Sequence, residues 1–79
     1  MEYYHESLKL YEELGDKQGI ANSLINIGAV YKNQGNIKQA LRCFNKSLKL
    51  LEDLGDKQGI AISLNNIGHV NYDQGDIAK

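Results

Sequence analysis

The apolar residues of this chain recur every three or four positions in four successive segments, at about residues 2–14, 17–34, 37–54 and 57–74. That spacing is the period of an α-helix, and no stretch keeps the period-two alternation of a half-buried strand. The pattern therefore predicts an all-α protein. The fourth segment copies the second, and the expected apolar faces of the first three are Tyr4, Leu8, Tyr11 and Leu14; Ile20, Leu24, Ile27 and Tyr31, with Ala21 and Gly28 beside them; and Ile37, Ala40, Leu41, Phe44, Leu48 and Leu51.

A glycine followed by aspartate or asparagine ends each segment, at Gly15-Asp16, Gly35-Asn36, Gly55-Asp56 and Gly75-Asp76. Glycine suits the left-handed conformation that closes a helix, and Asp or Asn suits the N-cap of the next one. Because the loops are only two or three residues long, consecutive helices should form antiparallel hairpins. We expect three long helices after the shorter first one, and residues 76–79 resemble the start of a fourth long helix.

The chain repeats itself. Leu-Gly-Asp-Lys-Gln-Gly-Ile-Ala occurs at residues 14–21 and again at 54–61, and an offset of 40 gives 22 identities in 39 aligned pairs. A fixed period of this size indicates stacked helical or strand units, and such repeats usually present surfaces to partners. The repeat therefore predicts a binding function without naming the partner. Gly28 lies in the middle of a predicted helix, where we expect a neighbouring helix to pack against its bare backbone.

These residues resemble the tetratricopeptide repeat family, whose signature is W-x₂-L-G-x₂-Y followed by A-x₃-F. In the second copy Asn71 replaces the signature tyrosine. The period of 40 residues exceeds the usual 34, and no proline follows the second helix, so the chain looks like the extended subclass found in large adaptor and regulatory arrays. The matching positions are Leu24 (in the tryptophan place), Ile27, Gly28 and Tyr31; Ala40, Phe44 and the small Ser47; and Leu64, Ile67 and Gly68.

The resemblance implies an α-solenoid in which antiparallel helix pairs stack into a right-handed superhelix. Residues 1–15 would be the second helix of a partial repeat, with Tyr4 in the place of Phe44 and Ser7 in that of Ser47. Residues 16–55 would form a full repeat and 56–79 the first helix of the next. In this family the first helices line a concave groove that holds the partner. The groove residues would be Asn22, Ile25, Asn26, Ala29, Lys32 and Asn33 in the first copy, and Ile62, Asn65, Asn66, His69, Tyr72 and Asp73 in the second.

Asn26 and Asn66 are the strongest candidates, because an amide side chain both donates and accepts hydrogen bonds. A ladder of asparagines one repeat apart can pair with the backbone of an extended peptide. The alternative is that these side chains bond to the neighbouring helix or to water. Some family members grip a terminal carboxylate with lysines and asparagines at defined groove positions. The residues here do not reproduce that set, so no such clamp is predicted: Ile25, Asn65, Ala29 and His69.

Composition excludes several other classes of function. Nine basic and ten acidic residues leave a net charge of −1, without the concentrated basic surface that nucleic acid requires. No apolar run is long enough to span a membrane, and the N-terminal residues are too polar for a signal peptide. The single cysteine, Cys43, cannot form an internal disulfide, which fits a reducing compartment such as the cytoplasm.

Catalytic and metal chemistry find little support in the sequence. His5 and His69 lie on different predicted helices, and neither has a recognised ligand spacing, although His69 and Asp73 could share a helix face. Cys43 next to Phe44 suggests a partly buried apolar residue and not a nucleophile. We therefore predict no enzyme, cofactor or metal, and we read the basic stripe on the third segment as a solvated convex face: Lys38, Arg42, Lys46 and Lys49.

The leading functional prediction is a non-enzymatic scaffold that binds a protein partner, as a peptide or helix, in a concave groove. The alternative is a structural module that self-assembles, because interior repeat sequence at both ends leaves apolar faces without neighbours. Such ends would stack end to end or exchange helices. A third hypothesis, a regulatory domain that senses a small ligand within a larger protein, would need an enclosed pocket or an attached effector domain.

Overall fold

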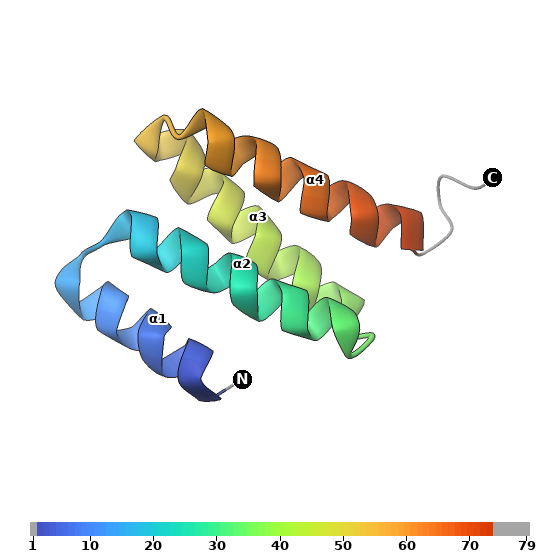
Figure 1. Ribbon diagram of the computed structural model, residues 1–79, viewed down its shortest axis with the longest axis horizontal. Helices are drawn as coiled ribbons and strands as arrows, with labels where there is room; N and C mark the ends of the chain where they lie inside the picture. The colour runs from blue at the N-terminus through green and yellow to red at the C-terminus, as the bar shows by residue number, and fades with distance from the viewer. Residues whose placement is uncertain (1, 74–79) are drawn as a thin grey trace.

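The computed structural model describes the backbone of residues 2–73 and the side chains of residues 2–70. Within that range it contains four α-helices, α1 (Glu2–Leu14), α2 (Lys17–Asn33), α3 (Ile37–Leu54) and α4 (Lys57–Asp73). Each helix runs antiparallel to the one before it (Figure 1). The predicted all-α class and the order of helical segments are confirmed, whereas the start of a further helix predicted at 76–79 lies outside the described residues.

The three connections use the same backbone device. Gly15, Gly35 and Gly55 have φ angles of 70°, 81° and 70°, in the left-handed region that glycine adopts without steric penalty. In each case the amide of the residue after the glycine donates to a carbonyl five residues earlier, as Asp16 does to Tyr11 at 3.0 Å. This is the Schellman closure of a helix, so the predicted role of these glycines as helix ends is confirmed.

The N-caps follow the prediction at two of three helices. The Asp16 carboxylate accepts from the Gly19 amide at 3.0 Å, and the Asp56 carboxylate accepts from the Gly59 amide at the same distance. Asn36 occupies the N-cap position of α3, but its side chain makes no capping hydrogen bond. The prediction that Asn36 caps like the aspartates is therefore wrong in its hydrogen bonding, although the helix begins where expected.

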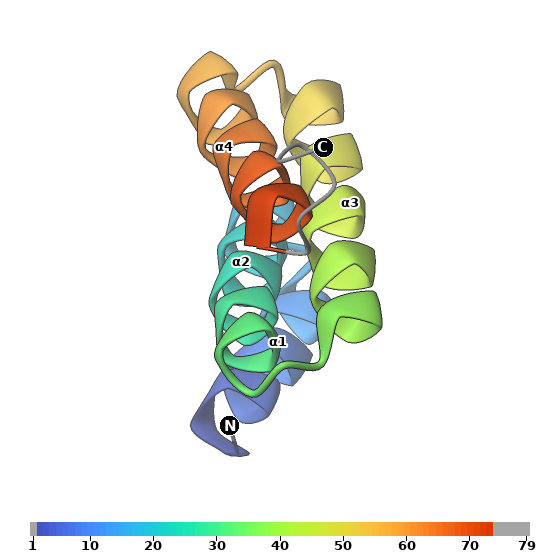
Figure 2. The same cartoon turned by 90° about the vertical axis from the view of Figure 1, so that its right-hand side faces the viewer.

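The helices form two layers. Helices α2 and α4 lie on one side of the molecule and α3 lies on the other (Figure 2). Helix α2 packs between α1 and α3, α3 packs between α2 and α4, and α2 also touches α4 directly. The inner helices α2 and α3 therefore have neighbours on two sides, whereas α1 packs only on α2 and α4 packs mainly on α3.

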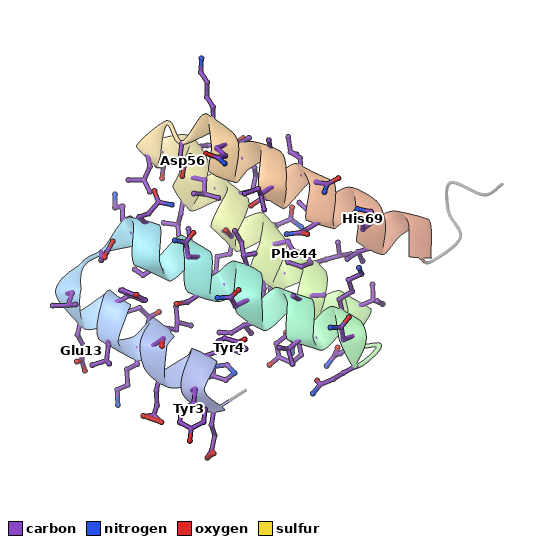
Figure 3. The ribbon with its side chains drawn as sticks, in the orientation of Figure 1. Tyr3, Tyr4, Glu13, Phe44, Asp56 and His69 are labelled. Atoms are coloured by element: carbon purple, nitrogen blue, oxygen red, sulfur yellow. The ribbon has the colours of Figure 1, made fainter. Side chains whose placement is uncertain are left out.

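The core lies where α2, α3 and α4 meet. Phe44, on α3, is 1% exposed and sits between α2 and α4 (Figure 3). A Cβ atom at Gly28 would lie 2.7 Å from Cε1 of Phe44, which confirms that a neighbouring helix packs on the bare backbone there. The Ser47 hydroxyl donates to the Ala21 carbonyl at 3.0 Å and joins α3 to α2.

The apolar face predicted for the first helix is only partly correct. Leu8 and Tyr11 are half-buried, but Tyr4 is 40% exposed and Leu14 is 76% exposed. Tyr4 lacks the second neighbouring helix that covers Phe44. Leu14 lies at the end of α1, as its counterpart Leu54 does on α3, and both leucines are exposed.

Candidate binding face

The predicted partner-binding residues lie on the neighbouring helices α2 and α4, and the surface formed by those whose side chains are described is hereafter the α2/α4 face. On α2 they recur at helical spacing, most of them on the side opposite the core stripe. Ile25 is the exception, because it packs against the buried cluster of Ala40, Phe44 and Val70. Ile25, Lys32 and Asn66 are half-buried; the others whose side chains are described are exposed, namely Asn22, Asn26, Ala29, Asn33, Ile62, Asn65 and His69. The side chains of Tyr72 and Asp73 lie outside the described part of the chain.

Asn26 and Asn66 occupy equivalent places on α2 and α4. The side-chain hydrogen bonds within residues 2–70 include those of Asp16 with Gly19, Asp56 with Gly59 and Ser47 with Ala21, and neither asparagine side chain takes part in one. No described group of the neighbouring helix therefore occupies these amides. Each amide can donate and accept hydrogen bonds at the same time.

The α2/α4 face is mainly uncharged and polar, and the two copies differ along it. Asn22 aligns with Ile62, Ile25 with Asn65, and Ala29 with His69 (Figure 3 labels His69 on α4). Asn26 and Asn66 are unchanged between the copies. A constant asparagine among variable neighbours is what backbone recognition with local side-chain preference requires.

Other candidate chemistry does not assemble into a site among the described residues. His5 is on α1 and His69 is on α4, and no group of three or more His, Cys, Asp or Glu side chains within residues 2–70 is placed to hold a metal ion. Burial raises the pKa of the Cys43 thiol, and the charges of Lys46 and Arg42 offset part of that rise. The thiol is therefore protonated at neutral pH, whereas a nucleophilic cysteine requires the thiolate.

The outer surface carries the basic stripe and a shallow hollow on α1. Lys38, Arg42, Lys46 and Lys49 are all exposed on α3, away from the α2/α4 face. The hollow, of about 300 Å³, is open to solvent and is lined by Glu6, Lys9, Leu10 and Glu13 of α1 alone. None of the helices, over the residues that are described, combines the length and the apolar character needed to cross a bilayer.

The comparison with known families settles the identity of the fold. The family model described as Tetratricopeptide repeat matches residues 2–53 and, in a second placement, residues 19–79. The chain belongs to the tetratricopeptide repeat family. The two overlapping placements together span the chain, as expected of a sequence that repeats itself.

A solved structure agrees at the level of the fold. The solution NMR structure of a designed protein, DA05, superposes with a TM-score of 0.85 at 22% sequence identity. The match covers 92% of this chain and 74% of the designed one. No curated protein matches the sequence. The comparisons thus establish a tetratricopeptide helical-repeat fold, and families of this kind are generally interaction scaffolds and not enzymes.

Sequence reasoning missed two kinds of contact. The Ser47 hydroxyl was expected only as a small residue, but it also donates a hydrogen bond across the α2–α3 contact. Gly19 and Gly59 lie against Tyr11 and a methyl group of Leu51, respectively. Gly19 aligns with Gly59 in the repeat, and Tyr11 aligns with Leu51. This equivalence is the signal that could have revealed the second kind of contact.

Proposed function

We propose that this chain is a non-enzymatic interaction scaffold that binds an extended peptide or a helix of a protein partner along the α2/α4 face. The observation that carries the proposal is the pair of equivalent side-chain amides of Asn26 and Asn66, on two neighbouring helices. Neither amide has a hydrogen-bond partner among the described residues. The tetratricopeptide fold supports it, because such repeats present this surface to partners.

The chemistry suits a partner whose main chain is accessible. An extended peptide offers one N–H and one C=O group per residue, and an asparagine amide can satisfy one of each. Because the α2/α4 face has little charge, affinity would depend on these hydrogen bonds and on contacts with Ile62 and His69. A strongly acidic or basic partner would find little electrostatic complementarity here.

The repeat boundaries belong to the same proposal. We take residues 16–55 as one full repeat, 1–15 as the second helix of a partial repeat and 56–79 as the first helix of the next. The capping aspartates at 16 and 56 support these divisions. The single cysteine supports a reducing compartment, and we place the protein in the cytoplasm.

Selection from a random peptide library on the purified chain, followed by affinity measurement, tests the proposal. Each lost hydrogen bond is worth about 1 kcal/mol, so the Asn26→Ala/Asn66→Ala double variant should bind the selected peptides roughly tenfold or more weakly. Asn45→Ala, on the exposed surface of α3, is the matched control and should leave affinity unchanged. Peptides whose affinity is equal for all three proteins would overturn the proposal.

Self-assembly is a second candidate function, and a specific observation favours it. Six of the seven large apolar residues that are exposed within residues 2–70 lie on the terminal helices: Tyr3, Tyr4, Leu10 and Leu14 on α1, and Ile62 and Leu64 on α4. Concentration-independent molar mass in light scattering would exclude this candidate without affecting the proposal for the α2/α4 face.

A further inference from the structure

The same sequence is buried on α2 and open on α4. Leu24 is 6% exposed, whereas its copy Leu64 is 54% exposed. Ala21 is fully buried beneath α3, whereas Ala61 is exposed. The difference arises because α3 packs on this side of α2, and no described element packs on the same side of α4. Ala61, Leu64 and Gly68 therefore form an uncovered face, hereafter the open face of α4, which is separate from the α2/α4 face.

Helix α1 is also incompletely covered, on the side that corresponds to the face through which α3 packs on α2. Its residues Tyr4 and Ser7 align with Phe44 and Ser47, the two residues through which α3 covers α2. Phe44 and Ser47 are buried in that contact, but Tyr4 is 40% exposed and Ser7 is exposed. In Figure 3, Phe44 lies between two helices, whereas Tyr4 has only α2 beside it. The chain therefore exposes both halves of an interface that it already forms internally.

From this correspondence we infer that the open face of α4 binds helix α1 of a second copy of the chain, in the register that α3 adopts on α2. The Tyr4 ring of one copy then covers Gly68 of the next, as Phe44 covers Gly28. The Ser7 hydroxyl donates to the Ala61 carbonyl, as Ser47 donates to that of Ala21. Each copy uses two different surfaces, so the contact is head-to-tail and extends into a chain of copies.

Gly68 provides independent support. A glycine inside a helix is less favourable than alanine by about 1 kcal/mol. At Gly28 the absence of a side chain admits Phe44, because a Cβ atom there would lie 2.7 Å from the ring. At Gly68 no atom of the described residues lies within 4 Å of the same position, so within residues 2–70 no side chain uses the space that the glycine leaves. A second copy's Tyr4 is the group that this space fits.

A matched pair of variants tests the role of Gly68. In light scattering across a concentration range, the wild type should show a molar mass that rises with concentration. Gly68→Gln places a side chain where Tyr4 would dock and should weaken association about tenfold or more. The same change should raise the thermal stability of the single copy, since glutamine is a better helix former. Asn45→Gln, on the exposed surface of α3, should associate like the wild type.

Cross-linking tests the register. Two single-cysteine proteins, Ser7→Cys and Ala61→Cys, are made in a Cys43→Ser background, mixed, and treated with a short bismaleimide. The expected product is a dimer linked between positions 7 and 61. A mixture of Ser7→Cys with Asn45→Cys should give no such dimer, because position 45 lies on the exposed surface of α3.

Several outcomes overturn the inference. A monomer at every concentration does so, as does association that Gly68→Gln leaves unchanged, which is the result expected if copies exchange helices at the turns. Cross-links between two positions 7 or two positions 61 would show a twofold dimer instead. None of these results bears on the α2/α4 face, whose peptide binding is tested separately with the Asn26 and Asn66 variants.

Discussion

At the scale of single residues, small side chains decide how closely the helices approach. Gly28 admits the ring of Phe44 and Gly59 admits a methyl group of Leu51, and a Cβ atom at either glycine would lie 2.7 Å from its neighbour. Each such glycine forgoes about 1 kcal/mol of helix propensity. In return, the larger residue reaches the backbone of the next helix.

Two buried serines should respond in opposite ways to removal of the hydroxyl. Ser47→Ala loses the hydrogen bond to the Ala21 carbonyl and should lower the free energy of unfolding by about 1 kcal/mol. The buried Ser63 hydroxyl has no hydrogen-bond partner among the described residues. Ser63→Ala should therefore leave the free energy unchanged or raise it, because an unsatisfied polar group is removed. Urea unfolding of the two variants beside the wild type measures both effects, and equal losses would contradict the assignment.

At the scale of helices, local chemistry sets the boundaries. The predicted starts at 17, 37 and 57 match the structure because the glycine and capping signals act within a few residues of each boundary. The periodic apolar stripes likewise identify which side of α2 and α3 faces the core. The same periodicity wrongly placed Leu14 on a covered face, because the spacing of apolar residues does not indicate where the neighbouring helix ends.

Substitution of the N-cap residues should affect the starts of α2, α3 and α4 to different extents. Asp16→Ala and Asp56→Ala each remove a carboxylate that accepts a first-turn amide, and each should lower the free energy of unfolding by about 1 kcal/mol. Asn36→Ala should have a smaller effect, because its side chain makes no capping bond. Thermal melts followed by circular dichroism provide the ranking. A loss at Asn36 as large as at the aspartates would show that its amide caps α3 in solution.

At the scale of the whole molecule, stability should be greatest in the middle of the chain. No residue of α1 is buried, whereas α2 and α3 contribute most of the core. Helices with few buried contacts open more readily than those between two neighbours. Amide hydrogen exchange at low concentration should therefore be faster in α1 and α4 than in α2 and α3. Uniform protection along the chain would contradict this gradient.

The two proposed interaction surfaces are compatible in one assembly. The α2/α4 face and the open face of α4 use different sides of the same helix, so a partner on one leaves the other accessible. If copies dock head-to-tail, the protection of α1 and α4 should increase with protein concentration. The groups of the α2/α4 face would then recur along the assembled array and offer a longer surface to a partner.

The sequence by itself determined the helices, their ends and the side of each helix that carries apolar residues, because these depend on contacts within a few positions along the chain. It also identified Asn26 and Asn66 as equivalent residues, because the repeat can be found by aligning the sequence with itself. Only the tertiary structure decided which copy of a residue is covered. Leu24 and Leu64 have the same identity and the same local sequence, yet one is buried and the other is open. Burial depends on whether another helix is present, and that is a property of the assembled fold.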